Sequence, residues 1–410
     1  MLILFFLLML LINISLVVYL KKNNKKFPTG PKSLPVIGSL LSVGFNLKDA
    51  FNKWRQQYGP IVGFYLGSQR CVLLNDGGEP VNLKNKTNLA VVNTLWQIIN
   101  GEKADLKDPQ MLKVFNSTSK FIEENSLCGP VMILPWLRHV PPFSRVFQSA
   151  RSSPQQMRRV TSTSISQHKE TKDSETPRDF IDCYLNKMEE TTDTTSSFYR
   201  DRGEGNIQRT TMDLFGAGSE TTSSILSFAV LYMIRFPQIQ EKVQAEIDAV
   251  IGSRSAMLED RPRMPYTEAV IHEILRHACL NYTVPHATTE DVVFHGWNIP
   301  AGTAVYANVS WIMNDPDHWE TPELFNPDRF LSPVTGQFRK NERCIPFLVG
   351  KRYCPGQQLA HHQIFLFLTG LLQHFSFSTP LNSHTSVNIQ PIVGFMHQCP
   401  EYQVIITERN

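Results

Sequence analysis

The sequence predicts a mainly α-helical protein with small β-sheets. Three long stretches carry apolar residues at helical spacing: Gly205–Phe236, Met264–His277 and Leu359–Phe375. Two shorter stretches alternate around glycines as β-hairpins do: Ile61–Leu74 and Val292–Thr303. These periodicities agree with the fold class, and the inference itself rests on the motifs described below.

The composition excludes several classes of protein. The chain has 410 residues, of which 42% are hydrophobic and 19% are charged, so it is long enough to bury a large core. A net charge of +3 gives no indication of a nucleic-acid partner. The seven cysteines include no Cys-x-x-Cys pair, which fits free thiols in a reducing compartment better than a disulfide framework.

The first 40 residues predict a membrane anchor followed by a hinge. Residues 1–20 are almost entirely apolar, which is long enough to span a bilayer core as one helix. The alternative is a cleaved secretory signal peptide, but the basic n-region and the small-residue cleavage site are missing. Four lysines between residues 21 and 26 would keep the rest of the chain in the cytoplasm. Residues 21–40 then form a basic, proline-rich hinge.

One cysteine marks the candidate site. Cys354 lies within Phe347–Gln357, with Gly350 four residues before it and Gly356 two residues after it. A long apolar helical pattern follows, so we expect the sulfur at the start of a buried helix, where the helix dipole favours a thiolate. The glycines allow the backbone to approach whatever the sulfur binds. A lone thiolate suits the axial bond to a haem iron better than a zinc or iron–sulfur site.

This stretch resembles the haem-binding signature Phe-x-x-Gly-x-Arg-x-Cys-x-Gly of the cytochromes P-450. All five fixed positions match: Phe347, Gly350, Arg352, Cys354 and Gly356. The resemblance implies the cytochrome P-450 fold after the transmembrane helix, with residues 41–410 as a haem-thiolate catalytic domain. It also implies haem b as the cofactor, held by these residues with Cys354 as the axial ligand of the iron.

A second motif, Ala217-Gly-Ser-Glu-Thr221, lies inside the longest predicted helix. Glycine and threonine are both locally unfavourable there, and read alone the pattern is typical of core packing. Ahead of the cysteine loop it resembles the oxygen-activation motif of the same family. The implied roles are Ala217 beside the haem, Gly218 opening the helix over the iron, Thr221 bonding the bound dioxygen, and Glu220 relaying protons.

Two further features match the family. Glu273 and Arg276 lie one helical turn apart among apolar residues, as in the family's Glu-x-x-Arg. Arg329, in Pro327-Asp-Arg-Phe330, would complete a structural clamp behind the haem. His286 follows a proline at the position where relatives hold a haem propionate, although a lone histidine after proline is more often a surface residue.

The chain departs from the family pattern near residues 75–87. Asn88–Asn100 predicts a helix that relatives carry well downstream of the first hairpin, so we expect an internally shortened catalytic domain. The family's propionate-binding Trp-x-x-x-Arg is absent, because none of the six tryptophans has arginine four residues later. Further on, Ser152–Pro177 is rich in Ser, Thr and basic residues, which predicts an exposed, mobile connection.

The resemblance implies a monooxygenase that inserts one atom of dioxygen into a small lipophilic substrate. Fatty acids, steroids, terpenoids and foreign compounds all remain open. The implied partners are an NADPH-dependent cytochrome P-450 reductase, a cytochrome b-type electron donor and the lipid bilayer of the endoplasmic reticulum, with the catalytic domain facing the cytoplasm.

Two alternatives stay open. One is a haem-thiolate isomerase or dehydratase that needs no reductase, which Glu220 and Thr221 argue against because such enzymes often lack the acid–threonine pair. The other is a shortened isoform with impaired haem binding and no activity, for which the missing internal segment argues.

Overall fold

The computed structural model describes residues 31, 53–54, 57–58, 61–66, 69–74, 83–104, 131, 134–172, 175–379, 388–393 and 396–409. The chain divides into two compact units, Met1–Val81 with Gln403–Thr407, and Asn82–Tyr402 with Glu408–Asn410. Helices account for most of the described residues and the strands are short, so the predicted mainly α class with small β-sheets is confirmed.

In the first unit, strands β1 (Ile61–Leu66) and β2 (Gln69–Leu74) form an antiparallel hairpin. The register pairs Ile61 with Leu74, so the first predicted hairpin is confirmed. The predicted anchor at residues 1–20 lies outside the described residues, as does the hinge at 21–40 apart from Pro31. Within the described part of the chain, no helix combines the length and the apolar character needed to cross a membrane.

The second unit is built mainly from helices. The α-helices are α4 (Leu83–Asn100), α7 (Phe143–Thr171), α8 (Phe180–Glu190), α9 (Arg200–Arg235), α10 (Pro237–Val250), α11 (Pro265–Ala278), α12 (Val309–Ile312) and α13 (Gln357–His374). The 3₁₀-helices are η2 (Pro135–His139), η3 (Leu258–Arg263), η4 (Pro327–Phe330) and η5 (Gly350–Arg352). The strands of this unit are β3 (Thr283–Ala287), β4 (Val292–Phe294), β5 (Trp297–Ile299), β6 (Ala304–Asn308) and β7 (Phe375–Ser378). Strand β8 (Ile405–Glu408) belongs to the first unit except for its last residue.

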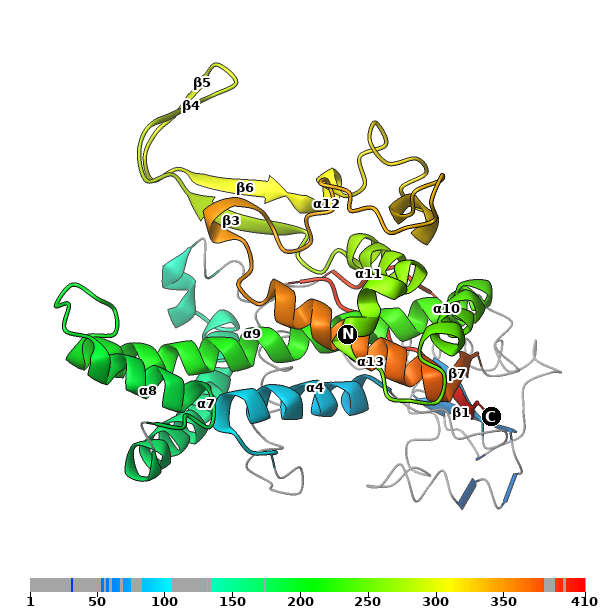
Figure 1. Ribbon diagram of the computed structural model, residues 1–410, viewed down its shortest axis with the longest axis horizontal. Helices are drawn as coiled ribbons and strands as arrows, with labels where there is room; N and C mark the ends of the chain where they lie inside the picture. Colours follow the sequence, from blue (N-terminus) through cyan, green and yellow to red (C-terminus); the bar gives the residue numbers. More distant parts are fainter. Residues whose placement is uncertain are drawn as a thin grey trace, which may run out of the picture. The chain divides into compact units, whose positions relative to one another are not determined.

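Helix α9 is the centre of this unit, and α4, α7, α11 and α13 all pack against it (Figure 1). Its C-terminal half is buried on every side from Thr222 to Ile234, as expected for a helix enclosed by other helices. Val91 and Leu95 of α4 pack with Leu226 of α9. The three helices predicted from apolar periodicity are therefore confirmed, and α9 begins five residues before the predicted stretch.

The prediction of an exposed connection at Ser152–Pro177 is wrong, because α7 continues as a helix to Thr171. Its inner face repeats at helical spacing through the buried Met157, Thr161 and Ile165. The hydroxyl of Thr161 donates to the carbonyl oxygen of Met157 at 2.9 Å. Buried serines and threonines that bond within their own helix can form a core face, and a count of polar residues does not detect this.

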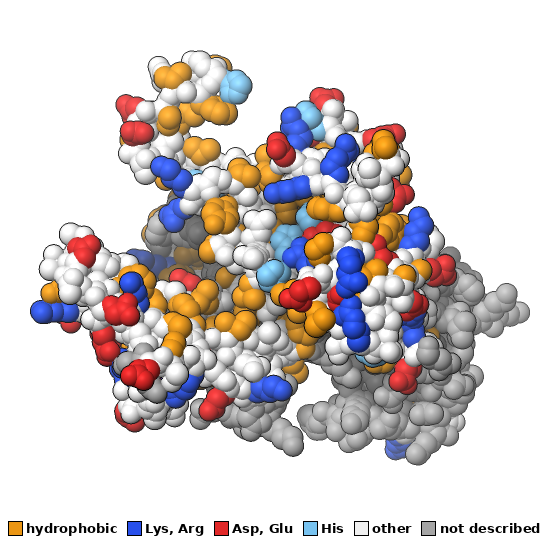
Figure 2. All heavy atoms as spheres, in the orientation of Figure 1, with side chains coloured by type: hydrophobic (Ala, Val, Ile, Leu, Met, Phe, Trp, Pro, Cys, Tyr) orange, Lys and Arg blue, Asp and Glu red, His pale blue; other side chains and the backbone are white. Residues whose placement is uncertain are grey.

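The strands form two-stranded ribbons rather than one sheet. β3 pairs antiparallel with β6, and β4 pairs with β5 in the second predicted hairpin, which is confirmed. His295 and Gly296 both have positive φ, 48° and 82°, as a tight two-residue turn requires. The β4–β5 hairpin projects from the ribbon β3–β6 (Figure 1) and carries exposed apolar side chains (Figure 2), among them Val293 and Trp297.

Candidate functional site

Cys354 sits in a tight loop at the beginning of α13. Its backbone N–H donates to the carbonyl oxygen of Phe347 at 2.9 Å, which closes the loop between these residues. Leu348 and Gly350 have positive φ, 63° and 77°, so the turn needs at least one glycine. Gly356 is the N-cap of α13, and the half-buried Cys354 lies two residues before this N-cap. A Cβ on Gly356 would touch the sulfur at 3.8 Å.

Opposite this loop, α9 presents Thr221. The Oγ1 of Thr221 donates to the carbonyl oxygen of Ala217 at 2.7 Å, one turn earlier in the helix. Threonine hydroxyls commonly bond the preceding turn in this way, and the bond fixes the direction of the oxygen. Thr221 is half-buried, whereas Thr222 and Ile225 beside it are buried.

The loop and α9 enclose one cavity of about 170 Å³. Its lining includes Thr221 and Ile225 from α9, Ile364 from α13, and Phe347, Arg352 and Cys354 from the loop. The structure thus brings four predicted site residues together: Phe347, Arg352, Cys354 and Thr221. The two remaining glycines of the signature, Gly350 and Gly356, belong to the same loop and act through its backbone geometry.

The donor set of this cavity fits a haem-thiolate site. Cys354 provides the single sulfur among the described lining residues, and no histidine competes with it there. The guanidinium of Arg352 can pair with a carboxylate such as a propionate. The volume lies below the ~300–1,000 Å³ typical of small-molecule pockets.

Other predicted residues lie outside this cavity lining. His286 is exposed on β3 and is not among the residues that line this cavity. Glu220 is 3% exposed and is not among the residues that line the cavity, and Ala217 is exposed. Gly218 faces α4, where an added Cβ would meet Leu95 Cδ1 at 3.0 Å. In this structure α9 is continuous at Gly218, and the missing side chain permits the close approach of Leu95 from α4.

The three residues expected to form a clamp are in contact. Arg276 Nε donates to Glu273 Oε2 at 2.7 Å, and Arg276 Nη2 donates to Oε1 at 2.9 Å. Arg329 Nε reaches Glu273 Oε1 at 3.2 Å. The side chains of Glu273 and Arg276 are fully buried, so this ion pair is shielded from water and salt.

A polar cluster near the cysteine loop was not foreseen from the sequence. Glu268 and His272 lie one turn apart on α11, and His361 approaches them from α13. Burial lowers the pKa of His272 and lowers that of His361 to about 3, with His272 and Arg261 adding to the effect on His361. The Glu-x-x-x-His spacing could have indicated the first two residues. No pattern in the sequence indicates His361, because α13 begins 79 residues after the end of α11.

The sequence profile described as cytochrome P-450 matches residues 28–77 and 75–406 of this chain. The chain is 39% identical over 321 residues to cytochrome P-450 2J2 of Homo sapiens, covering 77% of this chain and 62% of that protein. It is 38% identical over 345 residues to cytochrome P-450 2J5 of Mus musculus, covering 82% of this chain and 66% of that protein. It is also similar to cytochrome P-450 2B4 of Oryctolagus cuniculus, with 32% identity over 473 residues, 93% of this chain and 94% of that protein.

Proposed function

Because the chain belongs to the cytochrome P-450 family, we propose that it is a haem-dependent monooxygenase acting on a small lipophilic substrate. The observation that carries this proposal is the shared cavity of Cys354 and Thr221. A sulfur ligand on one side and a fixed hydroxyl on the other are what oxygen chemistry at a thiolate-bound iron requires.

The residues divide the work of the proposed reaction between them. When bound, haem supplies the redox chemistry that splits dioxygen, one atom entering the substrate and one leaving as water. Cys354 would hold the iron and Arg352 would pair with a propionate, with His286 as a second propionate partner after rearrangement of β3. Thr221 would hold a proton donor over the cavity, and Glu220, buried next to it in α9, would restore that proton.

The electrons, by this proposal, come from outside the chain. An NADPH-dependent cytochrome P-450 reductase and a cytochrome b-type protein are the proposed donors, at the cytoplasmic face of the endoplasmic reticulum. The apolar residues 1–20 and the lysines that follow support the proposed anchor and its orientation. The class of substrate stays at small lipophilic compounds.

A second candidate is a shortened, haem-poor isoform without activity. The two profile matches meet at residues 75–77, where the sequence predicts the missing segment. The alignment with the rabbit protein runs over 473 residues, although this chain has only 410. Two features of the structure also support this candidate. The cavity has a volume of only about 170 Å³, and Leu214 of α9 is an apolar side chain that is 37% exposed. A full-length relative would carry additional helices in the missing segment.

The carbon-monoxide difference spectrum of the reduced protein separates the two candidates. The full chain, expressed with haem precursor, should give the long-wavelength Soret band of a thiolate-ligated haem. Cys354→Ser should abolish that band, whereas Cys183→Ser, which changes an exposed free cysteine, should keep it. A wild-type spectrum with only the shorter-wavelength band, or with no haem, would establish the inactive isoform and refute the monooxygenase.

A further inference from the structure

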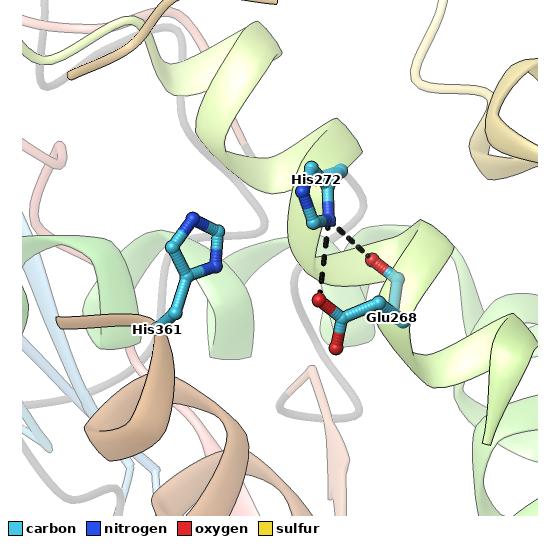
Figure 3. A group of neighbouring side chains, drawn as sticks. All are labelled: Glu268, His272 and His361. Carbon is cyan, nitrogen blue, oxygen red and sulfur yellow. Dashed lines mark hydrogen bonds and ion pairs between the residues drawn. The ribbon is translucent and has the colours of Figure 1, made fainter. Parts of the chain in front are cut away.

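We propose that Glu268, His272 and His361 form a binding site for a divalent transition-metal ion such as Zn²⁺, separate from the haem cavity. Glu268 and His272 project from α11 and His361 projects toward them from α13 (Figure 3). Two imidazoles and one carboxylate are a ligand set that proteins use for zinc. This inference does not depend on the proposed monooxygenase activity.

The ligand atoms are close enough to converge on one ion. One donor atom from each of the three residues lies within 4.8 Å of the others. Tetrahedral zinc with bonds of about 2.0–2.2 Å needs ligand atoms about 3.3 Å apart. Small rotations of the side chains therefore suffice to bring the donor atoms onto one ion, because they already lie within 4.8 Å of one another.

His361 is the observation that points to a ligand. Its side chain is buried, with 9% of the residue exposed, and Nδ1 has no hydrogen-bond partner among the described residues. An unpaired polar atom in such a position costs free energy, on the order of 1–3 kcal/mol, unless something binds it. The ring centroid lies 5.1 Å from that of His272, and one donor atom of His361 lies within 4.8 Å of those of His272 and Glu268.

His272 is oriented as metal-binding histidines usually are. Its Nδ1 donates to the backbone carbonyl oxygen of Glu268 at 2.9 Å, as Figure 3 shows. A neutral imidazole with its proton on Nδ1 keeps a lone pair on Nε2. Metal-ligating histidines commonly donate their second ring nitrogen to a carbonyl oxygen, which fixes the tautomer.

The charges around the cluster set the kind of ion and a limit on its affinity. Arg261 donates to both carboxylate oxygens of Glu268, Nε to Oε2 at 3.1 Å and Nη2 to Oε1 at 2.5 Å. Each oxygen keeps a further lone pair, so Glu268 can bind a metal beside Arg261. The positive charges of Arg261 and Lys340 oppose any cation, and only a metal with strong affinity for imidazole overcomes them. Zn²⁺, Ni²⁺ and Cu²⁺ meet this condition, and Mg²⁺ does not.

An ion can reach the cluster from the surface. Glu268, His272 and His361 line an open cavity of about 420 Å³, and Figure 2 shows histidine side chains at the surface of this face of the molecule. The ring of His361 also packs 5.1 Å from Phe347, the first residue of the cysteine loop. A bound ion would therefore tie α11 to α13 directly behind that loop.

The test measures zinc stoichiometry by equilibrium dialysis and mass-spectrometric metal analysis of the purified full chain. Wild type should bind one Zn²⁺. In His361→Gln and in His272→Gln the dissociation constant of this ion should rise about tenfold or more. His362→Gln is the matched control, because it changes the neighbouring histidine on the same helix and should retain the ion. All three variants keep the seven cysteines, so zinc bound by thiols cancels in the comparison.

Thermal unfolding of wild type gives an answer that needs no variant to fold. Saturating Zn²⁺ should raise the midpoint of unfolding, because a ligand that binds only the folded state stabilises it, and Mg²⁺ at the same concentration should not. Equal zinc content in wild type and folded His361→Gln overturns the site. So does a wild-type midpoint that Zn²⁺ leaves unchanged.

Discussion

Arg276 donates two hydrogen bonds to Glu273, and both side chains are completely buried. Arg276 also donates to the carbonyl oxygens of Met313 at 2.9 Å and Pro322 at 2.8 Å, so the pair ties α11 to the segment that follows α12. Arg329 adds a third contact to the same carboxylate. One buried carboxylate therefore holds two arginines and a length of irregular chain in place.

Replacement of this carboxylate should destabilise the fold strongly. Glu273→Gln leaves Arg276 buried without its counter-charge, and we expect a loss of about 3–5 kcal/mol in the free energy of unfolding. The matched control is Glu190→Gln, which breaks the exposed ion pair with Lys187 and should cost at most about 0.5 kcal/mol. Urea unfolding followed by circular dichroism measures both, and similar losses in the two variants would contradict the clamp.

Asp260 should make stability depend on acid pH. Its carboxylate accepts hydrogen bonds from Arg254, from the backbone N–H of Met257 at 2.9 Å and from Arg263. These bonds, that of Arg254 above all, hold the pKa of this carboxyl below its usual range. In the unfolded chain the carboxyl takes up a proton near its ordinary pKa of about 3.9, whereas in the folded protein it stays ionised. The stabilisation is thus complete above that pH and is lost as the pH falls toward the folded pKa.

Asp260→Asn is expected to cost about 1–3 kcal/mol at pH 7, because the arginines lose a charged acceptor. Below about pH 4 the wild type should lose stability faster than the variant, so the two curves of stability against pH converge. Urea midpoints between pH 7 and pH 3 measure the difference. Curves that stay parallel would show that another group causes the acid dependence.

Features set by local chemistry were predictable from the sequence. The turn His295-Gly296 is made by two neighbouring residues, and Glu273 and Arg276 are three residues apart. In each case the spacing alone determines which residues meet. The start of α7 and its continuation to Thr171 were not predictable in this way. The Ser and Thr residues of α7 predict a polar connection. Only packing against α8 and α9, and the hydrogen bond of Ser164 to Asn100 of α4, decide that Thr161 and Ser164 are buried.

The site shows the same division between local and distant information. The motif singled out Cys354 and Arg352, and both line the cavity, because their loop is closed by its own hydrogen bond from Cys354 to Phe347. His286 depends on where the ribbon β3–β6 lies, and this is set by contacts between distant segments. The cluster with His361 joins two helices that are far apart in the chain, and a pattern within one segment cannot reveal it.

Two glycines in α9 should respond differently to alanine. A Cβ at Gly216 meets nothing within 4 Å, so Gly216→Ala should stabilise the helix by about 0.5–1 kcal/mol. A Cβ at Gly218 would lie 3.0 Å and 3.1 Å from the two methyl carbons of Leu95, and the gain in helix propensity is offset by this crowding. Gly218→Ala should therefore be less stable than Gly216→Ala in urea unfolding. Equal stability of the two variants would show that α4 does not depend on this glycine.

Thr221 tests whether the hydroxyl in the cavity serves proton delivery. We expect Thr221→Ala to form the haem-thiolate spectrum at normal yield, because the side chain touches neither Cys354 nor Arg352 through any described hydrogen bond. The fraction of consumed oxygen that appears as product should fall about tenfold or more, since general acid–base groups contribute ~10²–10⁴-fold. Thr221→Ser keeps the hydroxyl and should restore most of the coupling, whereas Thr221→Val, equal in size but without a hydroxyl, should not. Oxygen uptake and product formation with one lipophilic substrate give the ratio for all four proteins. Wild-type coupling in Thr221→Val would assign Thr221 to packing alone.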